Sequence, residues 1–383
     1  MKHDAVQAAL RALAEASRRP HDGASVALVR DMLAHRSNHV VARAARAAGE
    51  AELSTLAPDL LAAFPRFLED PVRRDPGCAA KTQIVHALLA LNYAAPDVYL
   101  RGAAHVQKEP GFGPPIDTAP ELRATSAMAL VVIGDPAALT ICVNLLVDPE
   151  PAARAGGLRG LAASGRPDVA LLMRLFALRG DVDPGVLADA FVALLSLSTD
   201  EAVPFVAERL ASGDRDIARA AAMALGEARR PEAVAALRDH LPREDRPDVR
   251  HAVILSLATS RDEEAFTVLL EVVARGGAAD SKAAAAALGL YPHDAVLQHR
   301  VQAALDGRRP APGAPDARSE VSFRRAAASN RTAVPSAANP AATLHRITHS
   351  RTALTARWSR SRAPRTVGRG PGTDRRPRPG PPR

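Results

Sequence analysis

The side chains best suited to chemistry in this chain are its histidines, because imidazole binds metals and transfers protons near neutral pH. Those in or beside the apolar helical segments are His86, His251, His293 and His299. No two of them stand four residues apart beside a carboxylate, as a zinc-binding helix requires. Patterns for a serine nucleophile, a phosphate-cradling loop and a dinucleotide-binding turn are also absent. The sequence therefore predicts no metal site, no cofactor and no enzymatic activity.

Two cysteines, Cys78 and Cys142, lie on segments that we expect to be helical and apolar. Two thiols in a chain of 383 residues form no disulfide framework, and a metal site would need more ligands. We therefore predict that both are buried and act as small hydrophobic side chains.

A second group of candidates surrounds residues 106–121, where four prolines and two glycines make a helix improbable. We predict an inserted loop that, with neighbouring side chains, forms a partner-binding patch of aromatic anchors and polar contacts. The patch residues are Tyr99, Arg101, His105, Phe112 and Asp117, with His105 one helical turn beyond Arg101. The alternative is a loop packed on its own helices, with Phe112 as a buried peg.

A basic residue recurs seven positions before a leucine in four segments, at Lys81, Arg123, Arg154 and Arg250. One hypothesis is a row of cations that binds phosphates. The other is structural: each cation bonds an acidic residue of a turn or the helix-end carbonyls of an adjacent unit. Acidic residues such as Glu150 and Asp248 often precede the basic one. Ala218 and Ser281 interrupt the row, which favours the structural role.

The elements that would position these side chains form a repeat. In the segment 216–229, read as a helix, Ile217, Ala221, Ala224 and Leu225 fall on one stripe. Leu225 has counterparts at Leu88, Leu130, Leu161, Leu194, Leu257 and Leu288, and successive members are 42, 31, 33, 31, 32 and 31 residues apart. Such a period predicts stacked antiparallel helix pairs in an all-α, right-handed solenoid.

Composition agrees with this architecture and divides the chain. Hydrophobic residues make up 47% but aromatic residues only 3%, which suits closely packed Ala- and Leu-rich helices better than sheets. Residues 306–383 carry 17 Arg and 4 acidic residues, a charge of +13, so the total of +8 leaves −5 for residues 1–305. We predict a helical capping region at 1–77, a solenoid at 78–305 and a disordered Arg- and Pro-rich tail at 306–383.

The N-terminal segment is a charged amphipathic helix without the apolar core of a signal peptide. The chain contains no run of 18 apolar residues that could form an ordinary membrane span. We therefore expect a cytoplasmic protein.

Four segments resemble the HEAT-repeat superfamily: LRATSAMAL from Leu122, ARAGGLRGL from Ala153, IARAAAMALG from Ile217 and VRHAVILSL from Val249. The chain looks most similar to short bacterial HEAT repeats, which are related to the HEAT-like repeats of phycobilisome lyases. The resemblance covers about 78–290 and implies a scaffold for protein complexes. HEAT-like hydroxylases bind a di-iron centre through His-Glu pairs, which this chain lacks. HEAT-like DNA glycosylases need a cationic groove with aromatic side chains, but here the body is acidic and the single tryptophan, Trp358, lies in the tail.

Three functions follow as hypotheses. The first is a non-enzymatic scaffold that binds another protein through its concave helical surface and residues 106–121. The second is tetrapyrrole handling, which the resemblance to phycobilisome lyases implies. The third is salt-dependent binding of nucleic acid, or of another acidic partner, through the basic tail.

Overall fold

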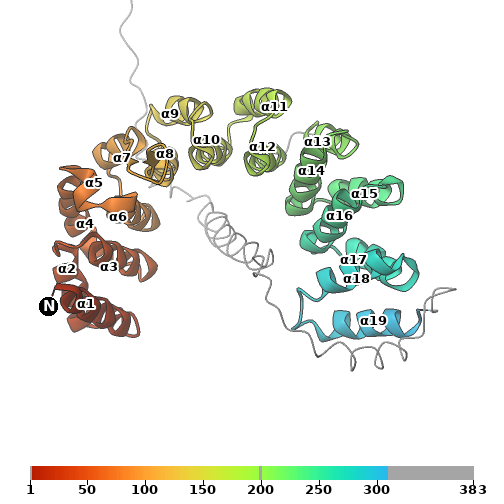
Figure 1. Ribbon diagram of the computed structural model, residues 1–383, viewed down its shortest axis with the longest axis horizontal. Coiled ribbons are helices and arrows are strands. Elements are labelled where there is room, and N and C mark those ends of the chain that lie inside the picture. Colours follow the sequence, from red (N-terminus) through yellow and green to blue (C-terminus); the bar gives the residue numbers. More distant parts are fainter. Residues whose placement is uncertain (1, 198–200, 309–383) are drawn as a thin grey trace, which may run out of the picture. The chain divides into compact units, whose positions relative to one another are not determined.

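The computed structural model describes residues 2–197 and 201–308 (Figure 1). These residues form 19 α-helices and one very short two-stranded sheet, so the predicted all-α solenoid is confirmed. The predicted disordered tail, including Trp358, lies almost entirely outside the described residues. Met1–Arg309 forms one compact unit, and the division of this unit into a capping region and a solenoid stays a prediction.

The α-helices, in chain order, are α1 (Lys2–Ala16), α2 (Gly23–Leu33), α3 (Asn38–Glu50), α4 (Ala57–Ala63), α5 (Pro71–Arg74), α6 (Ala79–Ala90), α7 (Pro96–Ala103), α8 (Pro120–Ile133), α9 (Ala138–Leu145), α10 (Pro151–Ala163), α11 (Ala170–Arg179), α12 (Pro184–Ser196), α13 (Ala202–Leu210), α14 (Arg215–Ala228), α15 (Pro231–His240), α16 (Pro247–Ser260), α17 (Glu263–Arg275), α18 (Ala278–Leu288) and α19 (Ala295–Asp306). The 3-10 helices are η1 (Ser54–Leu56), η2 (Phe64–Phe67), η3 (Pro76–Cys78), η4 (Pro167–Val169) and η5 (Leu241–Arg243).

The helices are arranged in pairs, and one helix of each pair contacts its counterpart in the next pair. This row of contacts runs through α3, α6, α8, α10, α12, α14, α16 and α18, which we call the second helices. From α7 onward, the helix that precedes each second helix packs against it. Figure 1 follows this succession of pairs along the colour scale. Each unit thus buries its apolar surface against the units before and after it.

The repeated leucines lie where the sequence predicts. All seven are on second helices, and each is at most 2% exposed. The stripe of α14 shows why: Ala221, Ala224 and Leu225 are fully buried, whereas Arg219 and Glu227 on the other side are exposed. The helical periodicity therefore identified the buried face.

Aspartates start several of the helices. Asp183 precedes α12, Asp214 precedes α14 and Asp262 precedes α17, and each side chain accepts hydrogen bonds from two N–H groups of the first turn. These groups have no partner within the helix, so the aspartate supplies one.

Two glycines allow second helices to approach closely. A Cβ on Gly156 of α10 would lie 2.2 Å from Cβ of Ala124 on α8. A Cβ on Gly226 of α14 would lie 2.5 Å from the carbonyl oxygen of Ser256 on α16. Together with the many alanines, these positions set the spacing between neighbouring units.

Residues 106–121 depart from the prediction in detail. They contain a short hairpin of β1 (Lys108–Glu109) and β2 (Ile116–Asp117), paired antiparallel with Lys108 opposite Asp117. The preceding helix α7 ends at Ala103, so the expectation that His105 lies on a helix one turn beyond Arg101 was wrong. We call residues 106–121 the insertion.

Among the helices of the described ranges, none has the length and apolar character that crossing a membrane would require.

Candidate functional site

The insertion is fixed at its base by buried hydrogen bonds. Gln107 is 2% exposed, and its Nε2 donates to the carbonyl oxygen of Asp75 at 2.8 Å and to Oε1 of Glu109 at 2.6 Å. The backbone N–H of Gln107 donates to Oδ1 of Asp117 at 3.2 Å. Through its side-chain amide and its backbone N–H, Gln107 thus joins both strands of the hairpin to the segment before α6.

Glu109 makes a second connection to that segment. Its Oε1 accepts from the N–H of Gly77 and from the hydroxyl of Thr118, both at 2.7 Å. Burial alone would raise the pKa of this carboxyl, but the hydrogen bonds from Thr118, Gln107 and Gly77 outweigh it and lower the pKa. The carboxylate is therefore stabilised in its charged form.

A fully buried ion pair lies in the same segment. Nζ of Lys81 is 2.9 Å from Oδ2 of Asp75 and also donates to the carbonyl oxygen of Phe67 at 3.1 Å. Asp75 further accepts from Nδ2 of Asn38 at 3.1 Å and from the N–H of Ala80 at 2.8 Å. Such a pair is stable in a buried site because its remaining hydrogen-bonding groups are satisfied.

Arg123 joins the insertion to the next helix pair. Its guanidinium is 3.0 Å from Oδ2 of Asp117 and makes two bonds of 2.9 Å to Asp148, in the turn before α10. It also donates to the carbonyl oxygen of His105 at 3.0 Å. Burial would raise the pKa of Asp117, but the N–H groups of Ala119 and Gln107, together with Arg123, outweigh it and lower the pKa.

The other predicted basic residues make comparable contacts. Arg154 pairs with Asp181 through two bonds of 2.7 Å and donates to the carbonyl oxygens of Asp148 and Pro149. Arg250 pairs with Asp280 at 2.6 Å and donates to the carbonyl oxygens of Leu241 and Glu244. These cations are occupied by acidic groups and carbonyls of their own and adjacent units, which leaves them poorly placed to bind phosphate.

The sequence reasoning missed which acidic residues are the partners. Glu150 is 3.9 Å from Lys108, and Asp248 pairs with Arg215 at 2.9 Å. Part of the signal is present in the sequence, because a carboxylate stands six residues before Lys81, Arg123 and Arg154, at Asp75, Asp117 and Asp148, and each of these pairs with Lys81 or Arg123. The partners of Arg154 and Arg250, which are Asp181 and Asp280, have no such spacing.

At Ala218 and Ser281, where the row has no cation, other side chains bond the helix-end carbonyl oxygens. Ala218 offers no donor, and Arg246 of the following unit instead donates to the carbonyl oxygens of Ser212 at 2.6 Å and Leu210 at 3.3 Å. At the last position, Oγ of Ser281 donates to the carbonyl oxygen of Val273 at 2.8 Å.

The tip of the insertion presents apolar side chains to solvent. Phe112 is fully exposed, so the alternative in which it is a buried peg was wrong. Ile116 on β2 is also exposed, at 60%, and so is Val106 at the start of the insertion, at 57%. A rigid polar base therefore carries an apolar, aromatic tip.

The other predicted patch residues do not share this exposure. Tyr99 is fully buried, and its hydroxyl donates to the carbonyl oxygen of Tyr93 at 2.7 Å. Asp117 is buried in the base of the insertion, and His105 is half-buried with Nε2 3.2 Å from Oε1 of Gln107. Arg101 is exposed. The five residues therefore form no single patch: Tyr99 and Asp117 are structural, and Phe112 and Arg101 reach solvent.

A comparison with known protein families identifies part of this architecture. Residues 203–289, which span most of α13 and all of α14 to α18, match the family model described as HEAT repeats. This chain carries HEAT repeats. The match includes two of the segments that suggested the resemblance, those from Ile217 and Val249.

Solved structures similar to the HEAT-repeat chain are distant. Human deoxyhypusine hydroxylase in complex with glycerol is 18% identical, with a TM-score of 0.25, over 63% of this chain and 99% of that chain. An engineered protein is 18% identical, with a TM-score of 0.33, over 79% of this chain and 94% of that chain. Similarity this weak says nothing about activity. No curated protein matches the chain significantly.

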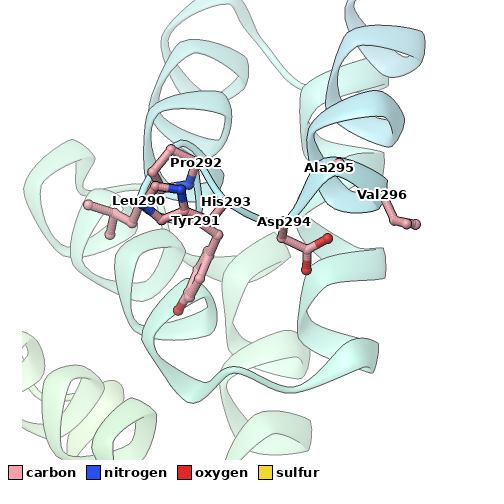
Figure 2. Close-up of a pocket in the computed structure, with 7 residues that line it drawn as sticks. All are labelled: Leu290, Tyr291, Pro292, His293, Asp294, Ala295 and Val296. Carbon is pink, nitrogen blue, oxygen red and sulfur yellow. The ribbon is translucent and has the colours of Figure 1, made fainter.

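An open surface hollow lies at the connection between α18 and α19 (Figure 2). Tyr291 points inward from it; its hydroxyl donates to the carbonyl oxygen of Ala258 at 2.6 Å, and its ring packs edge-on against Phe266. His293 and Asp294 of its lining are exposed, and Oδ1 of Asp294 accepts from the N–H of Leu297 at the start of α19. The residues of this hollow thus attach α19 to the repeats.

His86 and the two cysteines have structural surroundings, whereas His251, His293 and His299 are exposed. Nε2 of His86 lies 3.5 Å from Glu121 and 3.3 Å from the hydroxyl of Thr125. Within 2–197 and 201–308, no three His, Cys, Asp or Glu side chains are grouped so that they could hold a metal ion. Burial raises the pKa of the Cys78 thiol to about 11 and that of Cys142 to about 12. Both thiols are therefore protonated near neutral pH and poor nucleophiles.

Proposed function

We propose that this HEAT-repeat chain is a non-enzymatic scaffold that binds another protein, using the insertion and the exposed surface of its second helices. The observation that carries the proposal is Phe112, a fully exposed aromatic side chain at the tip of a hairpin whose base is held by buried hydrogen bonds. HEAT repeats generally mediate protein interactions.

A fixed base makes the hairpin tip suitable for binding. Aromatic side chains dominate the energy of many protein interfaces when they enter a pocket of the partner. Gln107 and Glu109 hold the strands in place before a partner arrives, so little conformational entropy is lost on association. Ile116, which is 60% exposed on β2, would extend the apolar contact beside Phe112.

The second helices offer an adaptable surface. Two positions before the repeated leucine, the side chain reaches the exposed side of the helix, and Met128, Val192, Met223 and Leu255 occupy this position in four units. Met223 is 42% exposed and the other three are half-buried. Methionine is flexible and polarizable, which suits a surface that receives another protein.

The proposal is tested by affinity copurification with the full-length chain, the Phe112→Asp variant and a Val296→Asp control. Val296 is an equally apolar, exposed side chain on α19, 72% exposed, so its substitution controls for a new surface charge. We expect a specific partner of the wild-type chain to be lost with Phe112→Asp and kept with Val296→Asp. The partner should also bind a chain shortened to residues 1–308.

Three results would contradict the proposal. If the partner still bound both the Phe112→Asp and the Met223→Asp variants, neither the insertion nor the second-helix surface would be the binding site. A coloured ligand in the purified protein would favour tetrapyrrole handling. Retention of nucleic acid that disappears in the shortened chain would favour the basic tail. We also propose that the protein works in the cytoplasm, which is consistent with its two free cysteines.

A further inference from the structure

Helix α11 is apolar on two opposite faces. Its inner face consists of Met173, Phe176 and Ala177, which are buried in the hydrophobic core. Its outer face consists of three exposed leucines, listed here with their exposed fractions: Leu171 (75%), Leu175 (64%) and Leu178 (57%).

The spacing of these leucines places them on one stripe. Residues four and three apart lie above one another on a helix, so the three side chains form a continuous ridge about two turns long. Leu172, on the same helix, and Val182, in the turn that follows it, are also exposed, at 38% and 98%. A surface helix normally carries polar side chains on its outer face, and a contiguous apolar surface indicates an interaction site.

We propose that the ridge Leu171–Leu175–Leu178 is the contact surface of a symmetric dimer, in which α11 packs antiparallel against α11 of a second copy of this chain. The ridge is self-complementary in this arrangement. Its spacing places Leu171 opposite Leu178 of the other copy, and Leu175 near its own counterpart at the two-fold axis. The proposal is independent of the partner-binding function proposed above.

The charges at the ends of α11 favour a second copy as the occupant. Asp168 precedes the helix and Arg179 ends it, and helical geometry puts both on the same flank of the ridge. In an antiparallel pair each Arg179 therefore lies near Asp168 of the other copy, and the helix dipoles are also opposed favourably. Within one chain, Asp168 pairs with Arg166 at 2.6 Å. Both side chains are exposed, so the carboxylate of Asp168 can also bond Arg179 of the other copy.

Arg174 is the one cation near the centre of the ridge, where its counterpart would approach. Its guanidinium lies over the ring of Phe205 at 4.4 Å and is 3.5 Å from Glu201. It is thus directed toward α13 and partly neutralised. Repulsion between the two copies at this position is correspondingly reduced.

The first experiment measures the oligomeric state of the full-length chain by sedimentation equilibrium over a range of concentrations. We expect a monomer–dimer equilibrium in the wild type and a dissociation constant raised about tenfold or more in Leu175→Glu. Leu290→Glu, at an exposed leucine outside the ridge, should leave the constant unchanged. Circular dichroism verifies that each variant is folded.

A second experiment tests the antiparallel register. Leu175→Cys should form an intermolecular disulfide under mild oxidation, because this residue approaches its counterpart at the axis, whereas Leu290→Cys should not. The native thiols of Cys78 and Cys142 are buried and should not compete. Arg179→Asp should weaken the dimer, and adding Asp168→Arg should restore it.

A wild-type chain that stays monomeric at the highest concentration would overturn the proposal. So would a dimer that Leu175→Glu does not weaken, because the contact would then lie elsewhere. A dimer weakened by Leu175→Glu, but without the Leu175→Cys disulfide and without rescue by the charge exchange, would overturn the antiparallel arrangement.

Discussion

Arg123 of α8 forms a two-pronged ion pair with Asp148, in which Nε and Nη2 each lie 2.9 Å from a carboxylate oxygen of the turn before α10. The same guanidinium contacts Asp117 at 3.0 Å. One side chain thus joins the insertion, its own helix and the next helix pair.

Replacing Arg123 with Met leaves the buried carboxylate of Asp117 and the half-buried carboxylate of Asp148 without this cation. We expect the free energy of unfolding to fall by about 3 to 5 kcal/mol, as is typical when one partner of a buried ion pair is removed. Urea denaturation measures the change. Arg166→Met is the matched control, because Arg166 makes a similar two-pronged pair with Asp168 at an exposed position. A similar loss of stability in both variants would contradict the role assigned to burial.

Leu225→Asp tests the repeat itself. Leu225 is fully buried between neighbouring units, so aspartate would place an unpaired charge in the core. We expect a sharply lower melting temperature by circular dichroism, with a loss of about 4 kcal/mol or more. Met223→Asp on the same helix, at a side chain 42% exposed, should change the melting temperature far less. An unchanged melt for Leu225→Asp would mean that the assigned core face is incorrect.

Glu244 should make stability depend on pH. The Arg246 side chain, with further hydrogen bonds from the N–H of Arg246 and from His240, lowers the pKa of Glu244 from about 4.5 to about 2. The folded state therefore binds this proton less tightly than the unfolded state. The resulting stabilisation is complete above about pH 4.5 and is lost as the pH falls toward 2.

Urea midpoints of the wild type and Glu244→Gln at several pH values measure this effect. At pH 7 the wild type should be more stable, and the difference should shrink between pH 4.5 and pH 2. Glu15→Gln, at an exposed carboxylate of α1, is the control and should show little difference at any pH. A difference between wild type and Glu244→Gln that is constant with pH would rule out the charged carboxylate as its source.

Gly226→Ala tests the close approach of second helices. Its Cβ would lie 2.5 Å from the carbonyl oxygen of Ser256, so α14 and α16 would have to separate. We expect a loss of about 1 to 3 kcal/mol despite the better helix propensity of alanine. Gly213→Ala, where a Cβ has nothing within 4 Å, should leave the urea midpoint unchanged. Equal effects of the two substitutions would count against a steric cause.

The repeat could be predicted from the sequence because the repeated leucines, such as Leu225, recur on a helical stripe that has to be buried. The hairpin in the insertion could not, because strands of two residues are too short to show an alternating pattern. The exposure of Phe112 and the burial of Tyr99 depend on packing between segments. Aromatic residue type gives no indication of either, since an aromatic ring serves equally well in a core and at an interface.

The partners in the row of basic residues illustrate a different difficulty. Arg154 and its partner Asp181 are 27 residues apart, and only the stacking of α10 beside the following turn brings them together. The sequence indicated a cation that bonds an adjacent unit, but choosing its acid requires the distance between units. That distance is set by small residues such as Gly156.

The ion pairs and hydrogen bonds that connect Asp117, Arg123, Asp148, Arg154 and Asp181 have a mechanical consequence. Asp148 accepts from Arg123 through its carboxylate and from Arg154 through its backbone carbonyl, so the bonds run without a gap from the insertion to the turn before α12. They end there, because Leu187, which stands seven residues before Leu194, has no donor in its side chain. Bending or stretching this part of the chain would load these polar bonds as well as the apolar contacts between helices, so we expect α8, α10 and the turn before α12 to move together.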